Sequence, residues 1–83
     1  MRTGHCTGTV RRWSAEAGWG VVDAPETPGG TWVEAGVVEG THGRPLRAGQ
    51  TVDLQFEAAD VEGFRYRATR VVPDDELGSS VGG

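Results

Sequence analysis

The alternation of apolar and polar residues along this chain predicts β-strands and no helix. Residues 51–56 give the clearest signal, because Val52, Leu54 and Phe56 fall on one face of a strand and polar residues fall on the other. No stretch shows helical periodicity over two turns. Shorter apolar runs bounded by turn-forming residues predict four more strands, at residues 9–13, 19–23, 31–35 and 64–72.

The connections between these runs are rich in glycine and proline. Residues 14–18 form a turn, and residues 24–30, with two prolines and two glycines, form a loop. Residues 36–48 contain three glycines and Pro45, which predicts a long irregular connection, and an acidic loop precedes the last strand. Five short strands with one long connection indicate an all-β fold, a five-stranded antiparallel OB-fold barrel.

The length of the chain, 83 residues, suits a single domain. We expect the barrel to occupy residues 8–72, after a frayed N-terminus at residues 1–7 and before a disordered acidic, Gly/Ser-containing tail at residues 73–83. The start of the chain has no apolar segment typical of a signal peptide, and Cys6 has no second cysteine to pair with. We therefore expect a cytoplasmic monomer that does not bind membranes.

All eight basic residues of the chain are arginine, and the net charge is −4. A negatively charged chain is a poor non-specific binder of nucleic acid, because such binding rests mainly on the neutralisation of phosphates. The acidic residues gather in the tail and in the loop before the last strand, away from Arg11 and Arg12. A local basic face is therefore compatible with the charge, and Arg65 and Arg67, which alternate on the last predicted strand, would extend it.

Tryptophans lie on the predicted strands beside two consecutive arginines. Trp19 and Trp32 stand among valines and glycines, while Arg11 and Arg12 directly precede Trp13. Indole rings beside guanidinium groups are suited to stacking on nucleotide bases and to contacting phosphates. The alternative is structural: Trp19 and Trp32 partly buried under a loop, Trp13 packed at the edge of the barrel, and the arginines paired with surface glutamates.

Four segments carry a family resemblance: GTVRRW at 8–13, EAGWGVV at 16–22, TWVEA at 31–35 and LRAGQTV at 46–52. They resemble, in order, the opening strand, the two RNA-binding motifs and the turn into the fourth strand of the bacterial cold-shock proteins. Members of that family are small OB-folds that bind single-stranded RNA and DNA. The resemblance covers about residues 8–72 and implies the same fold and the same class of ligand.

The resemblance also implies which residues would contact nucleic acid. Trp19 and Trp32 keep the first aromatic residue of each RNA-binding motif. Arg11 keeps a basic residue of the opening strand. Arg12 occupies the position of an exposed tryptophan in the family, and Trp13 replaces the phenylalanine beside it.

Other positions of this face depart from the family. Val21 replaces the second aromatic residue of the first motif, Glu34 replaces a histidine of the second, and only His42 stands near the position of a loop aromatic. Stacking contributes about 1–3 kcal/mol per base, so the loss of these rings predicts weak binding. Glu34 would instead accept a hydrogen bond from an exocyclic amine, such as that of cytosine.

The sequence therefore predicts a weak binder of single-stranded RNA or DNA that acts as an RNA chaperone or modulates transcription or translation. The alternative is a protein-interaction module that keeps the barrel and has lost most nucleic-acid binding. A small-ligand site beneath residues 36–48 is a third possibility. His5, Cys6 and His42 lack the spacing of a metal site, and no catalytic dyad is indicated, so we expect no metal, no cofactor and no enzymatic activity.

Overall fold

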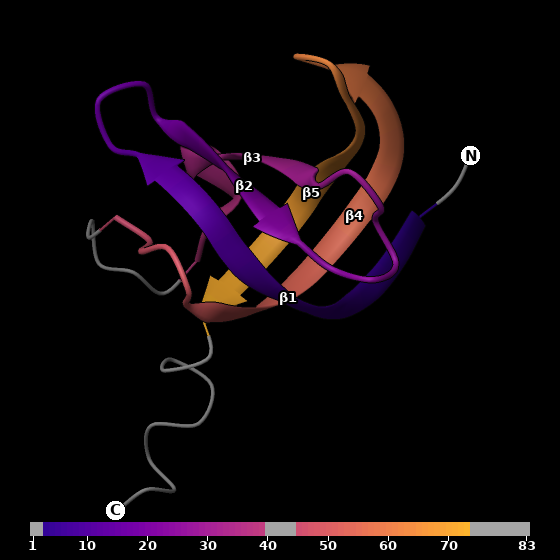
Figure 1. Ribbon diagram of the computed structural model, residues 1–83, viewed down its shortest axis with the longest axis horizontal. Helices are drawn as coiled ribbons and strands as arrows, with labels where there is room; N and C mark the ends of the chain where they lie inside the picture. Colours follow the sequence, from indigo (N-terminus) through magenta and orange to yellow (C-terminus); the bar gives the residue numbers. More distant parts are fainter. Residues whose placement is uncertain (1–2, 40–44, 74–83) are drawn as a thin grey trace, which may run out of the picture.

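The computed structural model describes residues 3–39 and 45–73, which form a closed barrel of five strands (Figure 1). The strands are β1 (Thr3–Ser14), β2 (Trp19–Asp23), β3 (Thr31–Glu34), β4 (Thr51–Val61) and β5 (Phe64–Pro73), and a 3-10 turn, η1 (Ala35–Val37), follows β3. Their order around the barrel is β1-β2-β3-β5-β4, and β1 closes on β4. The predicted all-β, five-stranded barrel of OB type is confirmed.

One of the five pairings in the barrel is parallel. β3 runs parallel to β5, with Thr31 opposite Tyr66 and Trp32 opposite Arg67, whereas the other four pairings are antiparallel. The reason is geometric, because strand directions cannot alternate all the way round a closed ring of five. The expectation of an antiparallel barrel therefore holds for every neighbouring pair except this one.

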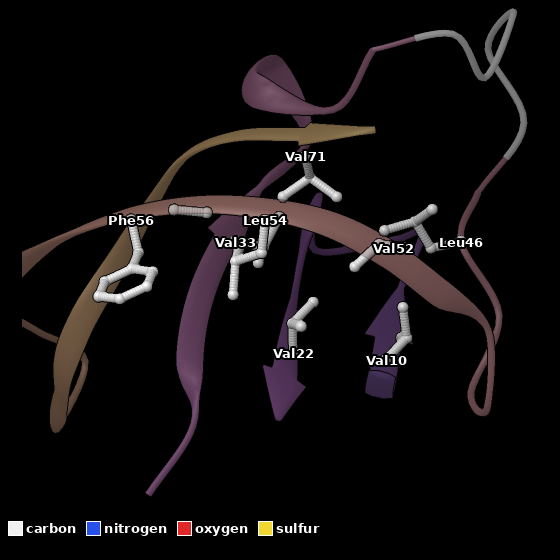
Figure 2. Close-up of a cluster of buried hydrophobic side chains, with 9 residues drawn as sticks. Val10, Val22, Val33, Leu46, Val52, Leu54, Phe56 and Val71 are labelled. Carbon is white, nitrogen blue, oxygen red and sulfur yellow. The ribbon is translucent and has the colours of Figure 1, made fainter. Parts of the chain in front are cut away.

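The barrel interior is filled mainly by branched aliphatic side chains from all five strands. Val52, Leu54 and Phe56 of β4 point inward, as the alternation predicts. Figure 2 shows them converging on side chains from the neighbouring strands. The buried cluster consists of Val10, Val22, Val33, Leu46, Val52, Leu54, Phe56, Ala68 and Val71. Burying a Val, Leu or Phe side chain stabilises a fold by about 1.5–3 kcal/mol, so this cluster holds the sheet in its closed form.

β1 begins earlier in the sequence than predicted. Residues 1–7 were expected to fray, but the segment from Thr3 to Thr9 pairs with β4 (Figure 1). Its inward positions carry small residues that contact larger core side chains: a Cβ on Gly4 would lie 2.5 Å from Cζ of Phe56. A strand whose inward residues are small lacks the apolar alternation by which strands are recognised.

The acidic segment after residue 56 is a strand and not a loop. β4 continues to Val61 and turns into β5 through Glu62 and Gly63, which have φ values of 53° and 84°. Two consecutive residues with positive φ are what a two-residue hairpin turn of type I′ requires. A tight hairpin therefore stands where the sequence predicts an acidic loop.

Residues 1–2, 40–44 and 74–83 lie outside the described residues, and so does most of the tail predicted at 73–83. Pro73 itself is buried as the last residue of β5. Within the part of the chain that the structure describes, no helix is long and apolar enough to cross a membrane.

Candidate nucleic-acid interface

Four side chains form a continuous patch on the outer surface of β1, β2 and β3. They are Arg12, Trp19, Trp32 and Glu34, and we call this patch the indole face. On β3, Val33 is buried in the core, so the neighbouring Trp32 and Glu34 lie on the opposite, outer side. The strand register then places Trp19 directly across from Glu34.

The two indole rings of this face lie against each other. The ring centroids of Trp19 and Trp32 are 6.3 Å apart, and the ring planes are tilted by 32°. Both residues are half-buried. The Nε1 atom of Trp32 is covered and has no hydrogen-bond partner among the described residues. What Trp32 offers to a ligand is therefore the surface of its ring and not its N–H group.

Arg12 brings a positive charge to the edge of the same face. The strand register shifts between Val10 and Arg12, and this β-bulge inserts Arg11 as an extra residue. After the bulge Arg12 pairs with Val21 on the outer side, and its guanidinium carbon lies 5.7 Å from the centre of the Trp19 ring. This is a cation–π contact, which holds the guanidinium plane beside the indoles.

Arg11 is occupied by an ion pair within the protein. Its Nε donates to Oδ2 of Asp23 at 2.9 Å, and its Nη2 donates to the backbone oxygen of Gly29 at 3.3 Å. The hydrogen bond from Arg11 holds the pKa of Asp23 below its usual value, and the same contact raises the pKa of Arg11. Of the two consecutive arginines, Arg12 is the one left without an ion-pair partner among the described residues.

Val21 lies beneath the indole face. It was expected to contact nucleic acid, but it is fully buried. The register places it between Arg12 and Trp32, and a Cβ on Gly30 would lie only 2.8 Å from its Cγ1 atom. Close packing of the loop before β3 therefore covers Val21, which supports the residues on either side of it and reaches no ligand.

Trp13 faces the opposite side of the sheet from Trp19. It is half-buried and packs against the core cluster. Its cross-strand neighbour is Gly20, and a Cβ there would lie 2.4 Å from Cε3 of Trp13. The missing side chain of Gly20 thus makes room for the indole, so the packing alternative that the sequence left open describes Trp13 better than an exposed platform does.

A shallow hollow of about 210 Å³ opens beside the indole face at the β1–β2 turn. It is lined by Arg12, Trp13, Ser14, Ala17, Trp19 and Gly20. Sequence reasoning missed this hollow. Its position depends on how the β1–β2 turn folds beside Trp13 and Trp19, which no local sequence pattern reports.

Three further residues were considered for contacts with nucleic acid, and their situations differ. Arg67 stands beside Trp32, and its Nε donates to Oε2 of Glu57 at 3.0 Å. Arg65 is exposed and forms no ion pair with any described residue. His42, expected at the loop, falls outside the described residues.

Of the three potential metal ligands, the structure describes His5 and Cys6, whereas His42 lies outside the described residues. Nε2 of His5 lies 2.5 Å from Oδ1 of Asp53. Burial and the nearby Glu26 raise the pKa of the Cys6 thiol to about 11, so the thiol is protonated and weakly nucleophilic at neutral pH. Within residues 3–39 and 45–73 no three His, Cys, Asp or Glu side chains come together as a metal site would need.

The chain matches none of the protein-family models compared with it, and no curated protein matches it either. Its class is therefore defined by its own architecture: a small all-β barrel with two adjacent tryptophans and an arginine on the outer face of three strands.

Proposed function

We propose that this protein binds single-stranded RNA or DNA through the indole face. The observation that carries the proposal is the contiguity of Arg12, Trp19 and Trp32 on the outside of the barrel. Flat rings that are partly exposed can stack on any base, and a guanidinium beside them can stack or contact a phosphate. The resemblance of the first three strands, and of the turn into the fourth, to cold-shock proteins supports the same ligand class.

The affinity that we expect is low, because the face offers only two rings and one unpaired cation. At about 1–3 kcal/mol per stacked base, two rings supply about 2–6 kcal/mol. We expect the upper half of this range, which together with a contribution from Arg12 corresponds to dissociation constants from roughly ten micromolar to about one millimolar. The net charge of −4 adds no general attraction to phosphates.

Such binding would act by occupancy and would need no bond-making chemistry. A protein that holds single strands shifts the equilibrium of weak hairpins toward the open form by mass action. We propose a role as an RNA chaperone, or as a modulator of transcription or translation, in the cytoplasm.

The test is a titration of tryptophan fluorescence with a short oligouridine at low salt. We expect saturable quenching that weakens with added salt and is largely lost in Trp19→Ala. Trp13→Phe is the matched control, because Trp13 packs inward. This variant should retain the quenching, and the quenched fraction of the total fluorescence should rise because Trp13 no longer contributes to it.

The opposite result would be an unchanged fluorescence up to roughly millimolar strand. It would overturn the proposal and favour the protein-interaction alternative, in which the same two indoles are anchors for a partner protein.

A further inference from the structure

Glu34 is a carboxylate with no structural task on the indole face. It is exposed on β3, directly across from Trp19. Although it is the N-cap residue of η1, its side chain makes no capping hydrogen bond. No hydrogen bond or ion pair holds its carboxylate among the described residues, and Arg12 engages the Trp19 ring instead.

The backbone that carries Glu34 is nonetheless well fixed. The amide of the next residue, Ala35, donates to the backbone oxygen of Gly18 at 2.9 Å, and the amide of Val38 donates to the oxygen of Ala35 at 3.1 Å. These bonds tie the end of β3 to the β1–β2 turn on one side and to η1 on the other. Glu34 therefore projects from a defined position beside Trp19.

A base stacked on Trp19 would bring one of its edges within reach of this carboxylate. Side chains directly opposite each other on an antiparallel pair have Cβ atoms about 4.5–5.5 Å apart. A glutamate side chain extends far enough from the sheet to reach the level of a ring lying on the indole. The carboxylate would then meet the hydrogen-bonding edge of the base, since its ring face is used for stacking.

From this juxtaposition we propose that Glu34 selects guanine among the bases that stack on Trp19. An ionised carboxylate only accepts hydrogen bonds. Guanine presents two neighbouring donors, N1–H and the N2 amino group, which match the two oxygens of one carboxylate. Cytosine and adenine present one amino group beside a ring acceptor, and uracil places its single N–H between two carbonyl oxygens that repel the carboxylate.

The inference rests on the proposed function, and it predicts a preference that stacking alone would not produce. Because Glu34 is exposed, we expect about fivefold to thirtyfold tighter binding of guanine than of adenine, a purine of similar stacking surface, which corresponds to about 1–2 kcal/mol.

The experiment compares four short oligouridines that differ only at the central base. Dissociation constants are measured by tryptophan fluorescence for the full chain, for Glu34→Gln and for Asp60→Asn. The second variant removes the same charge from an exposed position on β4, outside the indole face. We expect the strand with central guanine to bind tightest, Glu34→Gln to reduce the guanine-to-adenine ratio below about twofold, and Asp60→Asn to leave that ratio unchanged.

Three other results would each be decisive. If all four strands bind equally well to the unmodified protein, or if Glu34→Gln keeps the guanine preference, the role of Glu34 is overturned while the proposed function stands. If no strand binds at all, the proposed function fails and the selection of guanine fails with it.

Discussion

Gly20 affects the positions of two tryptophans. It leaves room for the ring of Trp13, and it directly follows Trp19 in β2. An added Cβ would lie 2.4 Å from the backbone oxygen of Arg12 and 2.4 Å from Cε3 of Trp13. The first of these atoms belongs to the backbone and cannot rotate away. A methyl group at this position must therefore push β1 and β2 apart where Arg12 and Trp19 meet.

We accordingly expect Gly20→Ala to destabilise the fold by about 1–3 kcal/mol, the usual cost of overpacking. Gly36→Ala is the matched control, because a Cβ there would meet no atom within 4 Å. That control should be neutral or stabilising by up to about 1 kcal/mol, through the reduced entropy of its unfolded chain. Urea unfolding measures the free energy of unfolding of both variants. If Gly20→Ala and Gly36→Ala were equally stable, the prediction would be wrong, because β1 and β2 would have moved apart at little cost.

At the scale of elements, the ion pair between Arg11 and Asp23 ties β1 to the end of β2 and, through the oxygen of Gly29, to the loop before β3. The pKa of Asp23 is lowered in the folded state by the hydrogen bond from Arg11. A carboxyl with a lowered pKa stabilises the fold above its unfolded-state pKa, and this contribution is lost as the pH falls through the folded-state pKa. The pair is nearly half exposed, which limits its worth to about 0.2–1 kcal/mol.

Asp23→Asn should therefore lower the free energy of unfolding by up to about 1 kcal/mol at neutral pH. The loss should shrink as the pH falls through the lowered pKa of the folded-state carboxyl, because the protonated side chain no longer forms the ion pair. Asp60→Asn changes the net charge equally without breaking an ion pair among the described residues, so its stability should stay within about 0.5 kcal/mol across the pH series. Urea unfolding over a pH series gives the comparison. If Asp23→Asn lowered the free energy of unfolding by the same amount at acidic pH, the lost contact with Arg11 would not be the cause.

The elements that the sequence predicts well are those whose inward side chains are large. The alternation of Val52, Leu54 and Phe56 identifies the first half of β4 without ambiguity. The first half of β1 escapes prediction because Gly4 and Gly8 face inward and make room for Phe56 and Val22 on the neighbouring strands β4 and β2. That fit depends on residues about 50 and 14 positions away, and no local pattern reports it.

The candidate site divides in the same way. Trp19, Trp32 and Arg12 can be chosen from their residue types and from motif resemblance, and the structure brings these three side chains together. The burial of Val21 follows from the close packing of Gly30, and the pairing of Arg11 with Asp23 follows from the β-bulge in β1. Neither the loop packing nor the bulge is visible in the local sequence.

At the scale of the whole molecule, a net charge of −4 means that binding to a phosphate chain must depend on where the unpaired arginines are. Among the described arginines, Arg11, Arg67 and Arg70 form ion pairs with acidic side chains. Arg12 is the unpaired one on the indole face. The electrostatic part of binding should therefore come from very few phosphate contacts.

We expect a logarithmic plot of affinity against salt to have a slope of about −0.7 to −1.4, because each phosphate contact on a single strand contributes about −0.7. Arg12→Gln should flatten that slope by about 0.7 and weaken binding at low salt, where counterion release matters most. Arg47→Gln removes the same charge from the loop before β4, outside the indole face, and should leave the slope nearly unchanged. Fluorescence titrations at several salt concentrations measure all three slopes. A slope that is steep and insensitive to Arg12 would place the phosphate contacts elsewhere on the barrel, and a slope near zero would mean that the indoles bind their ligand without help from charge.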